Sequence, residues 1–206
     1  MKPCKLIMFL FLFILPAVAL AGGEDALYGS VAPKGSAFIR FFNATIAAHG
    51  KLQVGNRRLA AAPYKASSYT YLEPGRYHLE SGSAVREAIL ASGQYYTAVL
   101  LAADTLVLID DIPFHNKKKA LLVCYNLTDS AHLSVITSKK KKVVFKDIPR
   151  LARRERLVNP VRIDLTLLDE AGHQTKAKTI VFERGRMFSL FASGPMAHPV
   201  LTWVIN

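Results

Sequence analysis

One short run in this sequence has the residue types and spacing of an acid–base pair. Asp129 and His132 stand three positions apart, the D-x-x-H spacing at which some esterase-like enzymes place an acid and a base. Such a pair also needs a nucleophile on a strained turn and an oxyanion hole. The chain contains neither a G-D-S nor a G-x-S-x-G segment, the usual settings of that nucleophile. We therefore interpret Asp129 as a turn aspartate and expect no catalytic residues.

Clustered cations offer a second kind of chemistry, the binding of a polyanion or an acidic partner. Such clusters neutralise a charged polymer and release its counterions, and arginine adds a planar fork that matches carboxylates. The alternative is that lysine runs cover hairpin tips and edge strands, where they discourage aggregation between sheets. The candidates form three groups, of which the arginine group is the best: Lys117, Lys118, Lys119; Lys139, Lys140, Lys141, Lys142; Arg153, Arg154, Arg156.

Aromatic side chains could stack on sugar rings, but their spacing favours another role. Tyr69 and Tyr71 are two residues apart on a predicted strand and so share one face, as a sandwich core requires. Trp203 is a further candidate, and Tyr64 lies in a loop-like stretch. The six histidines, at positions 49, 78, 115, 132, 173 and 198, form no H-x-H or H-x-x-x-H pair. We expect no metal site and no cofactor.

The first 21 residues have the pattern of a secretory signal peptide. Lys2 and Lys5 precede the apolar run 6–15, and Ala19-Leu20-Ala21 has the A-x-A form of a cleavage site. The run is short for a membrane span, so an uncleaved anchor is the weaker alternative. After cleavage Cys124 is the one remaining cysteine, so we expect no internal disulfide and no membrane-spanning segment.

The charge of the chain indicates an anionic partner outside the cytoplasm. Of 27 basic residues, 25 remain after Lys2 and Lys5 are removed, against 15 acidic ones, which gives a net charge of +10. Export argues against nucleic acid and leaves anionic lipid or acidic polysaccharide. A surplus of lysine that serves only solubility is the alternative.

The sequence repeats itself over a long period. In residues 38–45 and in residues 121–128, a largely apolar run of five residues is followed by Asn, one further residue and Thr. Residues 92–97 and 184–189 share a glycine turn, two bulky residues and a hydroxyl. Such a period indicates two related domains, which favours a scaffold or binding protein. The sequons at Asn43 and Asn126 occupy equivalent strand ends, so we expect these asparagines to close turns.

Alternation of apolar and polar residues predicts an all-β protein. About seven short strands per half indicate two tandem immunoglobulin-like β-sandwich domains after the signal peptide, at 22–112 and 113–206. Residues 147–159, with Pro149 and four arginines, are expected to form a basic loop or a short helix. The strands are expected at 36–42, 51–54, 68–72, 76–81, 85–90, 95–101, 105–109, 119–126, 132–137, 141–146, 161–168, 175–182, 187–192 and 202–205.

The repeat also predicts which way side chains point. Arg40 aligns with Val123, and Phe41 aligns with Cys124. Because neighbours on a strand point to opposite faces, an Arg40 that faces water places Phe41 and Cys124 in the two cores. We therefore expect Cys124 to be an inert core thiol.

Several segments, in one order, resemble the AlgF family of periplasmic alginate biosynthesis proteins. They are the residues 27–36, 113–121, 159–161, 183–185 and 199–204. The resemblance implies a role in O-acetylation of alginate. In that pathway a membrane-bound O-acyltransferase passes acetyl groups outward and periplasmic proteins with an esterase-like site place them on the polymer. The run Lys139–Lys142 departs from the family's pattern.

AlgF-like proteins are needed for acetylation but carry no established catalytic triad, so the resemblance implies an adaptor. We expect a periplasmic, non-catalytic protein that contacts the periplasmic acetyltransferases and the membrane-bound O-acyltransferase. The expected contact surface is Phe114, His115 and Asn116 with the adjoining lysines. The alternatives are a module that presents alginate polymer to the acetyltransferases, an acetyltransferase, and a chaperone for an envelope protein.

Overall fold

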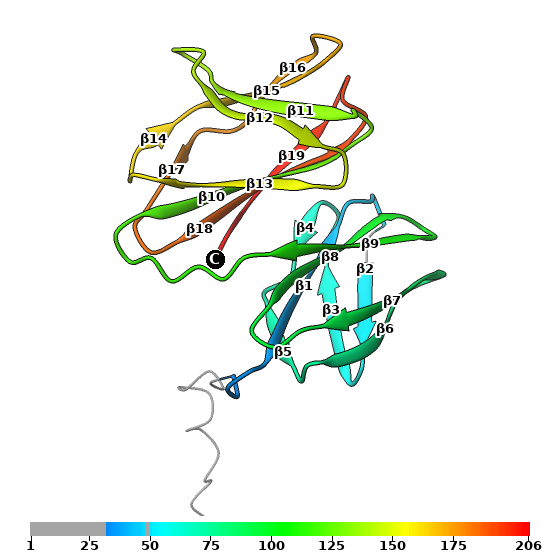
Figure 1. The fold of residues 1–206 in the computed structure, drawn as a ribbon. Coiled ribbons are helices and arrows are strands. Elements are labelled where there is room, and N and C mark those ends of the chain that lie inside the picture. The colour runs from blue at the N-terminus through cyan, green and yellow to red at the C-terminus, as the bar shows by residue number, and fades with distance from the viewer. Residues whose placement is uncertain (1–31, 48–49) are drawn as a thin grey trace, which may run out of the picture. The chain divides into compact units, whose positions relative to one another are not determined.

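Strands form all the regular structure in the part of the chain described by the computed structural model, which is residues 32–47 and 50–206. The predicted signal peptide, His49 and the first five residues (27–31) of the AlgF-like segment 27–36 lie outside the described residues. Within them, no helix has the length and apolar character needed to cross a membrane. Contacts join residues 33–206 into one unit. The structure is all-β, with two tandem immunoglobulin-like sandwiches that we call the N-terminal half (33–111) and the C-terminal half (112–206) (Figure 1).

The N-terminal half consists of two sheets that enclose a core. One sheet has the order β4-β1-β8-β9, with β5 also paired to β1, and the other has the order β3-β2-β6-β7. Ile39, Phe41, Leu52 and Leu79 belong to the core between them. The strands are β1 (Ala37–Asn43), β2 (Gly50–Val54), β3 (Arg57–Ala61), β4 (Lys65–Ala66), β5 (Thr70–Leu72), β6 (Gly75–Ser81), β7 (Ala84–Leu90), β8 (Tyr95–Ala102) and β9 (Thr105–Asp111).

The C-terminal half is built in the same way and adds a small ribbon. Its sheets have the orders β13-β10-β18-β19 and β12-β11-β15-β16, and β14 pairs with β17. Cys124, Leu133, Phe182 and Leu190 belong to its core. The strands are β10 (Ala120–Thr128), β11 (His132–Thr137), β12 (Val143–Pro149), β13 (Arg153–Val158), β14 (Arg162–Ile163), β15 (Leu165–Asp169), β16 (Gln174–Lys176), β17 (Ile180–Val181), β18 (Met187–Gly194) and β19 (Val200–Ile205).

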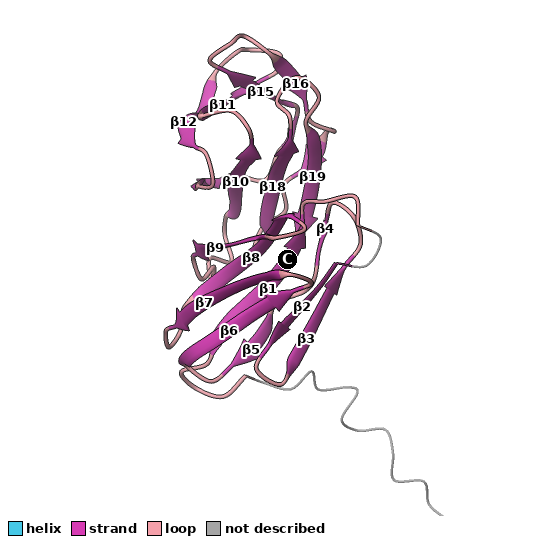
Figure 2. Cartoon of the chain, turned by 90° about the vertical axis from the view of Figure 1, so that its right-hand side faces the viewer, coloured by secondary structure: helices cyan, strands magenta, loops and turns pink. Residues whose placement is uncertain are grey.

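The repeat seen in the sequence is a repeat of strand pairing. Strand β1 runs parallel to β8 with Arg40 opposite Thr97, and β10 runs parallel to β18 with Val123 opposite Ser189. Both aligned segments therefore form the central parallel pair of their sheet (Figure 2). The equivalence of residues 38–45 and 121–128 is confirmed.

The two asparagines make the same contacts at the ends of β1 and β10. Asn43 Oδ1 accepts hydrogen bonds from the Thr45 amide and hydroxyl, and Asn126 Oδ1 accepts the same pair from Thr128. Each amide nitrogen donates to two carbonyls, those of Ala47 and Ala61 for Asn43. Asn126 donates to the carbonyls of residues 130 and 148. The prediction that these asparagines close turns is confirmed.

A third apolar cluster lies between the halves. It takes Phe42 and Val99 from the N-terminal half and Val123, Tyr125 and Phe191 from the C-terminal half. These residues alternate with those of the two sandwich cores, so the outer faces of two equivalent sheets pack against each other. The Phe191 ring stacks on Phe42 and on Tyr125, at centroid distances of 4.1 and 4.3 Å. The domain boundary at 112–113 stays a prediction.

Four expectations about secondary structure were wrong in detail. Residues 147–159 form mostly strand rather than a basic loop or a helix, because β13 pairs antiparallel with β10 from Ala120↔Val158 to Tyr125↔Arg153. The expected strand 161–168 is two strands, β14 and β15, and the expected strand 175–182 is also two, β16 and β17. The strand expected at 141–146 begins at Val143, because Lys141 has a φ of 51° and turns the chain. The strands β3 and β4 were not expected.

Candidate functional site

The position of Arg40 corrects the sequence-based expectation most sharply. The alternation on β1 does place Phe41 in the core, but the opposite face is covered by the C-terminal half rather than by water. Arg40 is 0% exposed and is the largest of the fully buried side chains among the described residues. A buried guanidinium requires partners for its charge and its donors.

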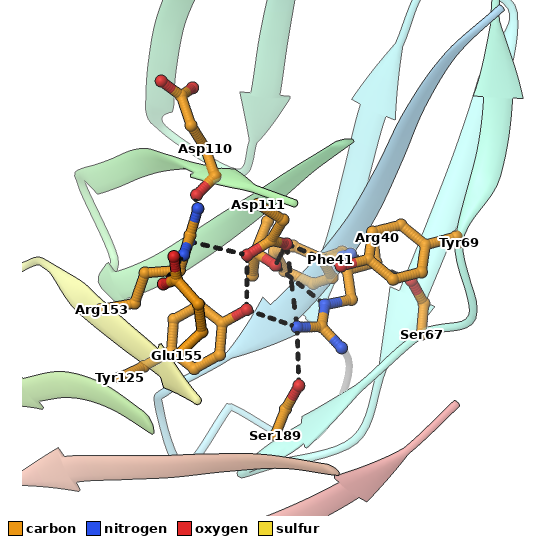
Figure 3. Close-up of polar contacts among 11 residues, drawn as sticks. Arg40, Phe41, Ser67, Tyr69, Asp110, Asp111, Tyr125, Arg153, Glu155 and Ser189 are labelled. Atoms are coloured by element: carbon orange, nitrogen blue, oxygen red, sulfur yellow. Dashed lines mark hydrogen bonds and ion pairs between the residues drawn. The ribbon is translucent and has the colours of Figure 1, made fainter. Parts of the chain in front are cut away.

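Residues from both halves supply those partners. Arg40 Nε donates to Thr97 Oγ1 at 2.8 Å, within the N-terminal half. Arg40 Nη2 donates to Tyr125 OH at 2.8 Å and to Ser189 Oγ at 3.1 Å, both in the C-terminal half (Figure 3). Because β8 and β18 are equivalent, Thr97 and Ser189 are the same position in the two copies of the repeat.

Asp111, the last residue of β9, supplies the negative charge. Its Oδ2 lies 3.8 Å from Arg40 Nη2 and accepts a hydrogen bond from Tyr69 OH at 2.7 Å. Thr97 Oγ1 and Tyr125 OH also donate to this carboxylate. Each of these two hydroxyls thus accepts a hydrogen bond from Arg40 and donates one to Asp111. These bonds orient the side chains of Arg40, Asp111 and both hydroxyl residues. We call Arg40, Tyr69, Thr97, Asp111, Tyr125 and Ser189 the central network.

The central network shifts the protonation equilibria of its members. Burial alone would lower the pKa of Arg40, but the interactions with Tyr125, Tyr69 and Asp111 outweigh it and raise that pKa. Burial raises the pKa of Tyr69 and of Tyr125 well above the usual tyrosine range, against the opposing effect of Arg40. Arg40 is therefore a permanent cation, and both tyrosines stay protonated donors at neutral pH.

The geometry of the central network suits attachment rather than reaction. Its hydroxyls and its carboxylate are directed at each other, and the guanidinium carbon of Arg40 lies over the rings of Tyr69 and Phe191 at 4.7 and 5.2 Å. Removing Asp111 leaves the guanidinium of Arg40 buried without a counter-charge. The network therefore fixes one sheet of the N-terminal half against one sheet of the C-terminal half.

The arginine group, the best binding candidate from the sequence, is divided between two places. Arg153 lies beside the central network, with its Nε 3.6 Å from Asp111 Oδ1, and donates to the Asp110 carbonyl. Arg154 and Arg156 are exposed, and Arg156 Nη1 donates to the Val144 carbonyl of β12 at 3.2 Å. Alternation on β13 explains the division, because residues 153 and 154 point to opposite faces of the sheet.

The first lysine group lies on a turn that precedes β10. Asn116 Oδ1 accepts the amides of Lys118 and Lys119 at 2.9 and 3.0 Å. Lys119 Nζ donates to Asn159 Oδ1, and the Lys119 carbonyl accepts the Gly185 amide at 2.9 Å. The segments 113–121, 159–161 and 183–185, which resemble the AlgF family, therefore contact one another in the structure. Of the predicted contact residues, His115 and Asn116 are exposed. Phe114 is half-buried against the cluster between the halves.

The second lysine group forms the tip of the β11–β12 hairpin. Lys139, Lys140 and Lys142 line a hollow of about 360 Å³, together with Val161, Ile163 and nearby residues of β14. Lys141 is exposed and in the left-handed conformation. Asp164 lies at this hollow, and a hydrogen bond from Thr179 together with the nearby Lys176, Lys139 and Arg162 lowers its pKa.

The candidate acid–base pair is not assembled. Asp129 Oδ1 accepts the Met196 amide at 2.8 Å, which makes it a structural turn residue. His132 Nε2 lies 3.9 Å from Glu170 Oε1, and Ser130 Oγ donates to the His132 carbonyl. Asp129 and His132 thus interact with different partners, and no hydrogen bond or ion pair joins these two described residues. Among the described residues no group of three His, Cys, Asp or Glu side chains could hold a metal ion.

The remaining candidates have structural roles. Cys124 is fully buried in the core of the C-terminal half, and burial raises its pKa to about 12, so its thiol is protonated at neutral pH. Tyr69 packs on the cluster between the halves, and Trp203 packs on the C-terminal core and donates to the Lys178 carbonyl at 3.0 Å. Tyr71 is half-buried with Arg57 over its ring, and Tyr64 adopts a φ of 55°.

Sequence reasoning missed the two charged residues that matter most for the arrangement of the halves. Asp111 lies beyond the end of the strand expected at 105–109 and was given no role, and Arg40 was expected to face water. One signal was available, since an arginine between Ile39 and two phenylalanines stands in a run that is otherwise apolar on both faces. A strand that is apolar on both faces is covered on both sides.

Comparison with known proteins places these features in one family. The family described as "Alginate O-acetyl transferase AlgF" matches residues 11–189. The "Alginate biosynthesis protein AlgF" of Pseudomonas syringae pv. tomato is 36% identical over 204 residues, covering 98% of this chain and 90% of that protein. The protein of the same name from Pseudomonas aeruginosa is 34% identical over 189 residues, covering 91% and 87%.

Two solved structures also match. The C-terminal domain of AlgF from P. aeruginosa is 30% identical, with a TM-score of 0.39, over 44% of this chain and 100% of that one. The N-terminal domain is 31% identical, with a TM-score of 0.35, over 40% and 100%. The family match and the curated relatives extend over most of the chain. This chain belongs to the AlgF family.

Proposed function

We propose that this protein is a non-catalytic adaptor in the O-acetylation of alginate, and that it acts in the periplasm. The observation that carries the proposal is the central network. Its polar side chains join two sandwiches instead of facing a cavity, and the exposed surface of the C-terminal half is left to carry the unpaired cations. A single compact unit with a basic exterior suits contacts with other proteins.

The distribution of charge supports a contact surface on the C-terminal half. Residues 33–111 hold 8 basic and 6 acidic side chains, a net charge of +2, whereas residues 112–206 hold 17 and 7, a net charge of +10. The partners are the periplasmic acetyltransferases and the membrane-bound O-acyltransferase of the pathway. His115, Asn116 and the lysines 117–119 belong to this contact surface, and the exposure of His115, Asn116, Lys117 and Lys118 supports that role.

Acetyl transfer by the chain itself is the second candidate, because the family's description names that activity. Asp129 and His132 are the residues that would carry it. Against this candidate, Asp129 is engaged by the Met196 amide and His132 lies near Glu170. Binding of alginate polymer is the third candidate, for which the exposed Arg154 and Arg156 are the residues available.

The acetyl content of exported alginate tests the proposal. We expect a strain that lacks this protein to export alginate without acetyl groups, and the complemented strain to restore them. The variants Asp129→Ala and His132→Ala should complement fully if the protein is an adaptor, whereas loss of acetylation by a folded variant would indicate catalysis. Normal acetylation in the deletion strain, or loss of the polymer itself, would contradict the acetylation role.

A further inference from the structure

Two lysine runs that are distant in the sequence lie at the two ends of one short segment. Lys119 Nζ binds Asn159 Oδ1 at the start of this segment. Five residues later, Asp164 lines the hollow together with Lys139, Lys140 and Lys142. Residues 159–164 therefore connect the turn before β10 to the tip of the β11–β12 hairpin.

The segment includes β14, whose partner β17 continues the same surface. Arg162 pairs with Val181 across the ribbon, and both are exposed. The Phe182 amide donates to the Val161 carbonyl at 2.9 Å, and β17 leads into the turn at Gly185, which binds the Lys119 carbonyl. We call Lys139, Lys140, Lys142, Val161 and Arg162, which line one hollow, the ribbon face.

The ribbon face combines an apolar centre with a cationic rim. Val161 is 47% exposed, and Ile163, two residues later on the same side of the ribbon, is half-buried beside the same hollow. Four of the five residues are cations, and Asp164 is the one acidic residue that lines the hollow. An apolar centre surrounded by polar groups is the anatomy of a protein contact.

We propose that the ribbon face docks an acidic segment of a partner protein that carries at least one aliphatic side chain. The aliphatic side chain enters the hollow of about 360 Å³ against Val161 and Ile163, and flanking carboxylates pair with Arg162 and the lysines. This inference rests on the proposed adaptor function and names the chemistry of the partner.

A protein segment fits the ribbon face better than the other two anions do. Sugar rings bind to aromatic faces, and none of the residues that line the hollow is aromatic. A bilayer offers no projecting side chain to fill a hollow, since a membrane-bound element lies flat in the headgroup region. Asp164 can accept a hydrogen bond from an N–H group of a peptide backbone, a donor that polyuronate and phosphatidylglycerol lack.

The test compares two triple variants of the mature chain that change its charge equally. The ribbon variant is Lys140→Glu, Lys142→Glu, Arg162→Glu, and the control is Lys51→Glu, Arg58→Glu, Lys65→Glu, at exposed cations of the N-terminal half. Binding to each purified periplasmic acetyltransferase of the pathway is measured by biolayer interferometry at two salt concentrations. Far-ultraviolet circular dichroism and thermal melting establish that each variant is folded.

We expect the dissociation constant of the ribbon variant to rise by about tenfold or more, and that of the control by less than about threefold. A synthetic peptide of alternating Glu and Leu should compete with the native complex, whereas a peptide of alternating Glu and Ser should compete less. The single variant Val161→Asp should weaken binding without removing any cation.

Three results would overturn the inference. Equal binding by the native chain and the ribbon variant would move the contact elsewhere and leave the adaptor function standing. Binding of polymannuronate oligomers or of phosphatidylglycerol vesicles that is lost in the ribbon variant, with acetyltransferase binding unchanged, would assign the ribbon face to polymer or lipid. Absence of any binding between the native chain and the acetyltransferases would contradict the adaptor function itself, and the inference with it.

Discussion

The two halves of this protein share one scaffold and use its outer surfaces differently. In both, a central parallel pair carries an Asn-x-Thr turn with the same hydrogen bonds. At the equivalent positions Arg40 and Val123 the halves diverge, and their net charges are +2 and +10. The comparison shows that the core-facing sides of the sheets and the Asn-x-Thr turns are alike in the two halves. The outer sides of the sheets differ in residue type and in charge.

The contact between the halves depends on this divergence. Arg40 and Val123 both lie on the outer face of an equivalent strand, and these faces pack together. If both equivalent positions carried arginine, two positive charges would lie close together in this contact, and their repulsion would destabilise it. With one arginine, the contact instead buries the Arg40–Asp111 ion pair of the N-terminal half, and Tyr125, Ser189 and Arg153 of the C-terminal half interact with it.

The largest expected effect follows from removing that carboxylate. We predict that Asp111→Ala lowers the free energy of unfolding by about 3–5 kcal/mol, because Arg40 is left buried without its counter-charge. Urea denaturation of the mature chain measures it. Asp110→Ala, at the exposed neighbour, is the control and should change stability by less than about 1 kcal/mol. The double variant Arg40→Val, Asp111→Ala should recover part of the loss, and equal effects of Asp111→Ala and Asp110→Ala would contradict this account.

A second prediction tests the equivalence of the two turns. Asn43→Ala and Asn126→Ala should each lower the free energy of unfolding by about 2–4 kcal/mol, because each substitution leaves one amide donor, one hydroxyl donor and two carbonyls without their partners. Urea denaturation again provides the measurement. Similar losses for the two variants would support equal structural roles, whereas a loss at one site alone would show that the repeat has decayed.

The pH dependence of stability tests the burial of one thiol and two tyrosines. The pKa of Cys124 is about 12 in the folded chain, and those of Tyr69 and Tyr125 are also raised. The folded state therefore holds these protons more tightly, so stability is retained below the unfolded pKa values and falls as the pH rises above about 9, by about 1.4 kcal/mol per unit for each titrating group. Denaturation at several pH values between 7 and 11 measures this slope. Cys124→Val should make it shallower, and an unchanged slope would argue against titration of the buried thiol.

The smallest expected effect concerns the lysine run. Lys140→Gln and Lys141→Gln should each change the free energy of unfolding by less than about 0.5 kcal/mol, because both side chains are exposed on a hairpin tip. Thermal melting of the two variants provides the check. A decrease in the free energy of unfolding above about 1 kcal/mol would show that this run stabilises the fold rather than being available for binding at the surface.

Much of the fold could be predicted because it depends on local pattern. The alternation of side chains on residues 38–43 correctly placed Phe41 and Cys124 in two cores, and the Asn-x-Thr match correctly identified equivalent turns. Strand β13 could not be predicted in this way. Its residues 153–158 are largely charged, and they form a strand because the edge of β10 supplies backbone partners.

The candidate site was less predictable than the fold. The basic groups were visible as runs, but their neighbours were not. Arg153 was grouped with Arg154, although adjacent strand positions face opposite ways. The hollow at Val161 requires the lysines of one hairpin and a ribbon about 20 residues later in the chain. Sequence separation gives no measure of such proximity.

By itself, the sequence determined the all-β class, the two related sandwiches, the family and the location of the cationic runs. These properties follow from side-chain alternation, turn chemistry and charge, each of which is local to a segment. The tertiary structure alone decided that Arg40 is buried, that Asp111 is its counter-charge, and that the ribbon face brings distant cations together. Those properties depend on which faces pack against each other, and burial turns an ordinary surface charge into one that requires a specific partner.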